Sequence, residues 1–189
     1  MNKPITDNDR WILSYYRYSE ISGALFFGTL LRVYRTGLLA RNLTKHTADE
    51  SQHAWYWTEC INSLGLEPLK VDKTYQEQYL EAVGLPVNLM EILAITQTFE
   101  KRVINQYTRH HTMPGLDPRI SATLRKIMED EKWHIQWIQK ALQDQEPEYG
   151  KETVEATLKR YAEADKEIFA RTLQEHEQRI EDMFQKRKI

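Results

Sequence analysis

The same five-residue pattern, D-E-x-x-H, occurs twice in this chain, at residues 49–53 and again at residues 130–134. Within each copy the Glu and the His are three positions apart, which places both side chains on one face of a helix. A further Glu precedes each copy by about one helix length. Glu20 lies 30 positions before the Glu of the first copy, and Glu100 lies 31 positions before the Glu of the second. The chain is therefore expected to fold so that four helices bring these side chains to one point.

Apolar residues recur at helical spacing along four long segments that carry these positions. A short helical piece over residues 73–83 is expected in the long connection between the second and third segments. A charged fifth helix over about 151–185 has a thin apolar seam, which indicates packing on the bundle or on a second subunit of a homodimer. The four main helices are expected to run from Asp7 or Asn8 to Thr36-Gly37, from Thr44 or Thr47 to Gly65, from Pro86 to Thr112, and from Pro118 to Pro147.

These segments predict an all-α fold with a single domain over residues 1–189. Short connections join helices one and two and helices three and four, which is typical of antiparallel hairpins. The longer connection between helices two and three suits a crossover. The prediction is an antiparallel four-helix bundle over about residues 8–145 with one long crossover, followed by the C-terminal helix.

The turn positions support the pairing of the glutamates. Two residues lie at the same height on antiparallel helices only if the turn is midway between them. The midpoint of Glu20 and Glu50 is position 35, and that of Glu100 and Glu131 falls at Gly115, so both coincide with expected breaks. Glu91 is the alternative on the third helix, but its midpoint with the Glu of the second motif is 111, before the Pro-Gly break. Glu100 is preferred for this reason.

Carboxylates and imidazoles gathered in this way indicate a site for two metal ions. Four glutamates carry a charge of −4, which two divalent cations would neutralise; without metal, buried carboxylates take up protons or destabilise a fold. Mixed oxygen and nitrogen ligands suit iron or manganese, and zinc could bind opportunistically. Metal-bound histidines usually donate their outer N–H to a carboxylate, a role expected for Asp49 and Asp130, including across to the neighbouring helix. The expected metal ligands are Glu20, Glu50, His53, Glu100, Glu131 and His134.

Composition excludes several other classes of protein. A net charge of −2 argues against a nucleic-acid-binding surface. The single cysteine cannot form an intrachain disulfide, which indicates a reducing compartment. The first residues form no signal peptide, and no apolar run is long enough to span a membrane. We therefore expect a cytoplasmic protein with no membrane or nucleic-acid partner.

The arrangement of motifs over residues 8–145 resembles the ferritin-like di-iron carboxylate superfamily, in which two helices each supply one Glu and two supply Glu-x-x-His. The segment EDEKWHIQWI, residues 129–138, is most similar to the fourth helix of bacterioferritins. Bacterioferritins have a haem-ligating Met directly after the second-helix Glu, where this chain has Ser51, so no haem is expected. Rubrerythrins add a Cys-rich module, which a chain with only Cys60 lacks. The long fifth helix differs from the short terminal helix of ferritins and argues against a storage cage.

The resemblance implies redox chemistry with dioxygen or peroxide at two metal ions, most simply iron. An oxygenase or oxidase acting on a small organic substrate is the leading hypothesis, with the substrate and the electron donor unspecified. Two alternatives stay open: a ferroxidase or peroxidase in iron or oxidative-stress handling, and a non-enzymatic, metal-stabilised interaction protein. No catalytic residue is expected beyond the metal ligands.

Small residues leave the first helix thin beside Glu20, so this side of the helix either lines a pocket or packs closely against a neighbour. A pocket there would admit a small substrate or dioxygen. The candidate lining residues are Gly23, Ala24, Phe27, Gln97 and Cys60.

Overall fold

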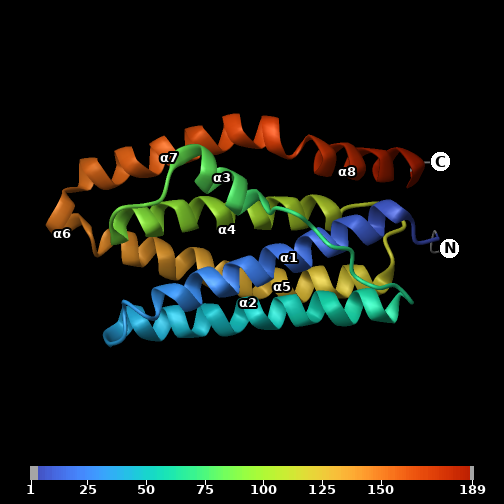
Figure 1. Cartoon of the computed structure of the whole chain (residues 1–189), viewed down its shortest axis with the longest axis horizontal. Coiled ribbons are helices and arrows are strands. Elements are labelled where there is room, and N and C mark those ends of the chain that lie inside the picture. Colours follow the sequence, from blue (N-terminus) through green and yellow to red (C-terminus); the bar gives the residue numbers. More distant parts are fainter. Residues whose placement is uncertain (1–3, 188–189) are drawn as a thin grey trace.

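The computed structural model describes residues 4–187, and all regular secondary structure in that range is helical, in agreement with the predicted all-α class (Figure 1). None of the helices in these residues is long and apolar enough to cross a bilayer. The helices are α1 (Asp7–Leu30), α2 (Gly37–Ser63), α3 (Tyr75–Val83), α4 (Leu89–His111), α5 (Pro118–Gln143), α6 (Glu146–Tyr149), α7 (Lys151–Thr172) and α8 (Gln174–Arg187).

The first connection is placed differently from the prediction. Helix α1 ends at Leu30, and α2 begins at Gly37, seven residues before Thr44 and ten before Thr47, the two expected caps. Thr44 and Thr47 do not cap the helix, because each donates its hydroxyl to the carbonyl four residues earlier, inside the helix. Gly37 has a φ of +75°, a backbone conformation that favours glycine and that marks the true end of the connection. The extra turns of α2 carry His46, which lies in one of the two buried groups of possible metal ligands.

Side-chain caps set the other helix starts. Thr6, rather than Asp7 or Asn8, caps α1 through a reciprocal capping box with Asp9. The third long helix begins at Leu89 and not at Pro86, since Asn88 accepts a hydrogen bond from the backbone N–H of Glu91 at 2.9 Å. The start of α5 at Pro118 is confirmed.

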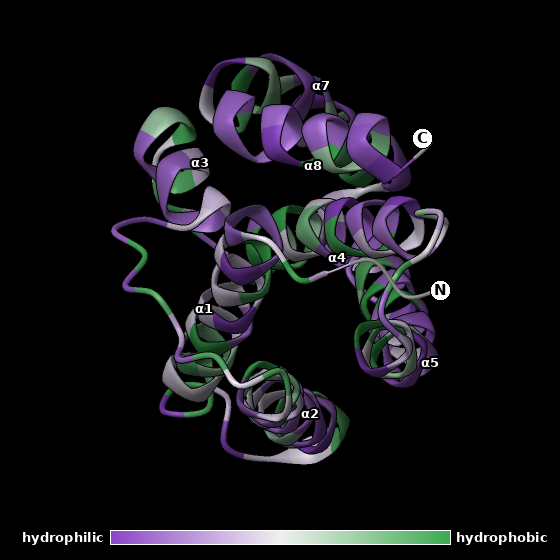
Figure 2. Ribbon diagram, turned by 90° about the vertical axis from the view of Figure 1, so that its right-hand side faces the viewer, coloured by the Kyte–Doolittle hydropathy of each residue, from purple (hydrophilic) through white to green (hydrophobic). Residues whose placement is uncertain are grey.

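Helices α1, α2, α4 and α5 form the bundle. Helix α1 packs along α2, α4 packs along α5, and α2 contacts α5. Figure 2 shows these four helices around a common centre, with α3, α7 and α8 together on the side of α1 and α4. Helices α1 and α4 approach each other less closely than the other neighbours do. A cavity lined by residues of α1, α3 and α4 lies on this side of the bundle.

The C-terminal segment is two helices rather than the single one expected. The backbone of Leu173 leaves the helical conformation, and its buried side chain separates α7 from α8. Helix α7 packs on α3 and α4, and α8 packs on α1, so the apolar seam covers the chain's own bundle. The buried Asp165 of α7 accepts a hydrogen bond from the Tyr75 hydroxyl at 2.6 Å and pairs with Arg102. These contacts tie α3 and α4 together through α7.

Beneath α8 lies a fully buried histidine, His110, close to Tyr16 and His176. Neither ring nitrogen of His110 has a hydrogen-bond partner among the residues that the structure describes. Burial, together with the nearby His176, Arg187 and His111, lowers the pKa of His110 to about 3. The ring is therefore neutral in the folded protein over the physiological range.

This histidine should make stability fall at mildly acidic pH. Unfolded His110 binds a proton below about pH 6.5, whereas folded His110 stays neutral to about pH 3. Stability contributed by neutral His110 is thus present above pH 6.5 and is lost as pH falls, by up to about 1.4 kcal/mol per pH unit. Urea unfolding should be measured at pH 7 and pH 5 for metal-free wild type and His110→Leu. The free energy of unfolding should fall less between pH 7 and pH 5 in the variant than in wild type. His111→Gln is the neighbouring control; equal losses in all three proteins would contradict this assignment.

Candidate metal centre

The bundle brings the four predicted glutamates together in its interior. Each comes from a different helix: Glu20 from α1, Glu50 from α2, Glu100 from α4 and Glu131 from α5. Their exposed fractions are only 3, 6, 6 and 1%, respectively. The two histidines of the D-E-x-x-H motifs are fully buried beside them. Four acidic groups thus share one site that water scarcely reaches.

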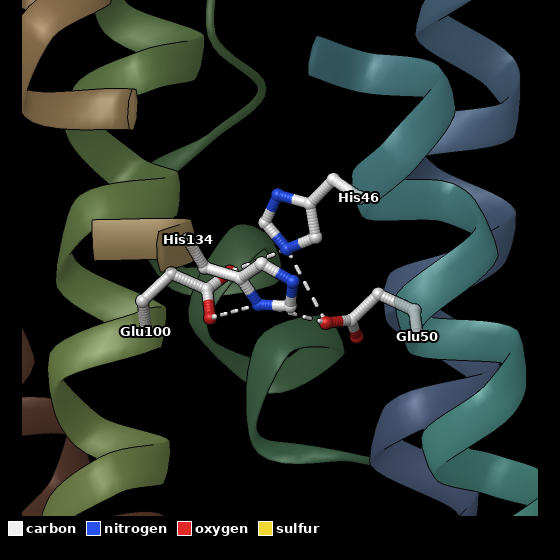
Figure 3. A group of neighbouring side chains, drawn as sticks. All are labelled: His46, Glu50, Glu100 and His134. Atoms are coloured by element: carbon white, nitrogen blue, oxygen red, sulfur yellow. Dashed lines mark ion pairs between the residues drawn. The ribbon is translucent and has the colours of Figure 1, made fainter. Parts of the chain in front are cut away.

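Two groups of side chains within this site could each hold a metal ion. One consists of His46, Glu50, Glu100 and His134, drawn in Figure 3. The other consists of Glu20, Glu50, His53 and Glu131. In each group, one ligand atom per residue lies within 4.8 Å of all the others. Glu50 belongs to both groups and is placed to bridge two ions.

Glu131 also faces both groups. Its Oε1 lies 3.4 Å from His53 Nδ1, and its Oε2 lies 3.2 Å from His134 Nδ1. Glu20 and Glu100 lie at opposite ends, with Glu20 Oε2 3.5 Å from His53 Nδ1 and Glu100 Oε2 3.7 Å from His134 Nδ1. The geometry therefore has two carboxylates between the groups and one at each end.

The aspartates of the two motifs fix the orientation of each other's histidines. The Nε2 of His134 lies 3.2 Å from Asp49, and the Nε2 of His53 lies 3.3 Å from Asp130. Partial burial opposes ionisation of Asp49, but hydrogen bonds with His134 and Lys45 lower its pKa to about 2. Each aspartate accepts from an outer N–H, which leaves Nδ1 of both histidines facing the carboxylates. The hydrogen bonds run across the bundle, from each motif to the other.

Without metal, buried side chains of the site bind protons where metal ions would otherwise balance the charge. Burial and the charges of Glu20, Glu100 and Glu131 raise the pKa of Glu50 well above its ordinary value. Burial opposes a charge on His53, but the nearby carboxylates of Glu131 and Glu20 raise its pKa well above the ordinary value. Divalent cations would displace these protons, so metal affinity should increase with pH.

The residues present fit two divalent cations. His53 Nδ1 and Glu131 Oε1 are buried and have no well-formed hydrogen bond in the described part of the chain, and both point into the site. Four carboxylates balance two divalent charges, and two Nδ1 atoms complete a mixed oxygen and nitrogen set.

A third histidine, His46, was missed by the sequence analysis because the helix containing it was expected to begin near Thr44 or Thr47. It lies four residues before Glu50 on the same face of α2, a spacing that would have identified it once the helix start was known. Its Nε2 lies 3.2 Å from Glu50 Oε1 and 3.3 Å from Glu100 Oε1. Its ring is stacked on His134 with centroids 3.6 Å apart.

The tautomer of His46 differs from that of the motif histidines. Trp137 donates its indole N–H to His46 Nδ1 at 3.1 Å, and an indole nitrogen can only donate. Nδ1 therefore carries the lone pair, and the neutral ring, favoured by burial that lowers the pKa of His46, has its proton on Nε2. An Nε2–H group is suited to donating toward Glu50 and Glu100, whereas a metal ligand needs a free lone pair there.

Replacing His46 should therefore weaken the centre without removing a metal ion. We expect His46→Gln to keep two ions per chain and to bind them about 10- to 100-fold more weakly, as is usual when a group that supports the metal ligands from outside is lost. His134→Gln is the matched variant and should lose one ion. Titration of both variants with Co²⁺ measures how many ions each binds and how tightly. Loss of an ion from His46→Gln would show that His46 is itself a ligand.

Tyr107 and Trp57 orient the carboxylate at the α1 end. The Tyr107 hydroxyl donates to Glu20 Oε1, and the Trp57 indole donates to the Tyr107 oxygen at 3.1 Å. All three side chains are buried. Glu20 Oε1 is thus engaged, and Oε2 faces His53. Tyr107 is seven residues after Glu100, on the same face of α4, which is the signal that could have linked it to the site.

A cavity of about 360 Å³ reaches this centre between α1, α3 and α4. Of the candidate lining residues, Gly23 and Phe27 border this cavity, and so do all four glutamates. Ala24, Gln97 and Cys60 do not. Ala24 is rotated beyond Glu20 and away from the cavity, since each residue turns the helix by about 100°. Gln97 and Cys60 are buried in the core outside the cavity lining.

Glycine at position 23 allows this arrangement of α1 and α2. A Cβ at Gly23 would overlap with Glu50 Oε2 and lie 3.1 Å from Glu50 Cδ. The Glu50 carboxylate therefore occupies space that a side chain at this position would fill. Close approach to Glu50, rather than helix packing alone, accounts for this glycine.

The alternative glutamate on α4, Glu91, lies away from the centre. It accepts a hydrogen bond from the backbone of Val87 at 3.0 Å and pairs with Arg160 of α7. Of the two glutamates weighed for this helix, Glu100 is the one inside the bundle.

Comparisons with family models, curated proteins and solved structures find no match to this chain. The functional assignment therefore depends on the geometry of the centre and its cavity.

Proposed function

We propose that this protein is a ferritin-like two-metal oxidoreductase that reacts with dioxygen or peroxide and oxidises a small organic substrate. The observation that carries the proposal is the cavity of about 360 Å³ that ends on Glu20, Glu50, Glu100 and Glu131. A purely structural metal site has no need of such a cavity, because its ligands can be closed off by the core. Ligand cavities of this size suit small organic molecules.

Iron is the metal that fits the proposal best. The ligand set combines hard carboxylate oxygens with borderline imidazole nitrogens, which suits iron or manganese and also allows zinc. Two ferrous ions would together supply two electrons to dioxygen or peroxide. The residues of the chain would hold the ions, exclude bulk water and keep the charge of the centre balanced.

The protein's own hydrogen bonds define what each carboxylate can do. Glu20 is oriented by Tyr107, and Glu50 and Glu100 lie against His46. Glu50 and Glu131 face both groups of ligands. We infer that Glu50 is the carboxylate able to change its binding mode, because no Cβ at Gly23 confines its Oε2 on the α1 side. Gly23 belongs to the cavity wall, so the movement would take place where the substrate binds.

The test is anaerobic loading of the metal-free protein with ferrous iron, followed by exposure to dioxygen. We expect two ions per chain, oxygen consumption and a near-ultraviolet absorption of ferric carboxylate. Oxygen uptake with release of ferric iron from the protein would favour a ferroxidase instead. Tight binding of two ions with no reaction toward dioxygen or peroxide would favour a structural role and contradict the proposal.

A further inference from the structure

We propose that the cavity binds an apolar primary amine, with its ammonium group held by Gln76 and Glu77 of α3 and its apolar chain directed toward the metal centre. This inference depends on the proposed function, because it names the substrate class of the same site.

The walls of the cavity suit a hydrocarbon chain or a ring. Apolar side chains from three helices line it, and removing apolar ligand surface from water stabilises a complex by roughly 25 cal/mol per Å². These side chains are Leu25 and Phe26 of α1, Leu80 of α3, and Phe99 and Val103 of α4. A strongly polar ligand such as a sugar would leave most of its hydroxyl groups without partners there.

Charge excludes an acidic ligand. Among the described residues that line the cavity there is no Lys, Arg or His, whereas five are glutamates. A carboxylate or phosphate buried there would have no positive partner on the cavity wall, a costly state for a desolvated charge. A cationic or neutral ligand meets no such penalty.

Hydrogen-bond acceptors gather on the α3 side of the cavity. Gln76 Oε1 is buried without a partner among the described residues. Glu77 uses Oε2 to accept from the backbone and the hydroxyl of Thr74, which leaves Oε1 outside this capping box. Across the cavity, Thr96 donates its hydroxyl to the carbonyl of Ile92 and can only accept from a ligand. An ammonium group, with three donors and no acceptor, matches these groups.

The two ends of the cavity differ once metal is bound. Two divalent ions neutralise the four glutamates of the centre, so the inner end no longer attracts a cation. Glu77 has no ion pair among the described contacts, so no cation of the protein competes for its carboxylate at the α3 end. The ammonium group is therefore expected at α3, and the chain carbon to be oxidised lies at the metal end.

The test compares three probes that have similar alkyl chains and differ in the polar group: n-octylamine, 1-octanol and octanoate. Isothermal titration into the zinc-loaded protein avoids any redox reaction and measures binding alone. We expect octylamine to bind at least about tenfold more tightly than octanoate and more tightly than octanol. Glu77→Gln should weaken octylamine at least about fivefold and leave octanol unchanged, since Gln can keep the capping box. Glu81→Gln, an exposed position on the same helix, is the matched control and should change nothing.

Equal or tighter binding of octanoate or octanol would overturn the inference, as would an unchanged octylamine affinity in Glu77→Gln or the absence of binding by all three. The zinc content of each sample separates this inference from the proposed function. A protein that holds two zinc ions and rejects octylamine loses only the amine assignment. A protein that binds no metal loses the proposed function, and the dependence of octylamine binding on Glu77 then still decides whether α3 holds the ammonium group.

Discussion

Gly23→Ala should leave the bundle folded and severely weaken metal binding. A Cβ at this position overlaps with Glu50 Oε2, so the carboxylate must leave its place between the two groups of ligands. The side chain of Glu50 is flexible, and the backbone need not move. Alanine also favours a helix over glycine by about 0.8–1.0 kcal/mol. The metal-free variant should therefore be as stable as wild type, while its affinity for divalent ions falls by at least about tenfold.

Gly28→Ala is the matched control for this change. It lies on the same helix and gains the same helix propensity, but its Cβ would meet only Thr47 Cγ2, at an ordinary distance of 3.9 Å. Thermal unfolding of the metal-free proteins measures their stability, and titration with Co²⁺ measures their metal affinity. Normal metal affinity in Gly23→Ala would show that Glu50 is not needed at its observed position.

Glu50→Gln should have opposite effects on stability and on metal binding. The carboxylate is buried beside three others, and burial together with their charges raises its pKa. The neutral amide keeps the shape and removes that repulsion, so the metal-free variant should be more stable at pH 8 by about 1–3 kcal/mol. Because Glu50 belongs to both groups of ligands, at least one of the two ions should be lost.

Glu59→Gln, on the exposed side of the same helix, controls for the change in charge. Urea unfolding with and without added metal compares the three proteins. Wild type and Glu59→Gln should gain stability from metal, since an ion that binds only the folded state shifts unfolding by mass action. A similar gain in Glu50→Gln would contradict the bridging role of Glu50.

The positions that the sequence predicts well are those fixed by helical spacing. Glu and His three residues apart must share a face, and turns midway between paired glutamates set their heights. The choice of Glu100 over Glu91 followed from this spacing alone, and Glu100 lies in the buried cluster. The all-α fold and the crossover containing α3 follow from the same periodicity.

The parts that were missed depend on competing local signals or on contacts between distant segments. The start of α2 was placed too late because threonine favours caps, although here both threonines bond within the helix, and this concealed His46. The indole of Trp137 that fixes the His46 tautomer is 91 residues away in sequence. The break at Leu173 is set by burial against the bundle, which no local pattern predicts.

The most direct test of the two-metal centre is a crystal structure of the protein loaded with Fe²⁺ under anaerobic conditions, with anomalous data collected at the iron edge. The account predicts two anomalous peaks that share Glu50 and Glu131. One should lie between Glu100 and His134, and the other between Glu20 and His53, each within bonding distance of its ligand atoms. A single peak, or peaks only at surface carboxylates, would contradict it.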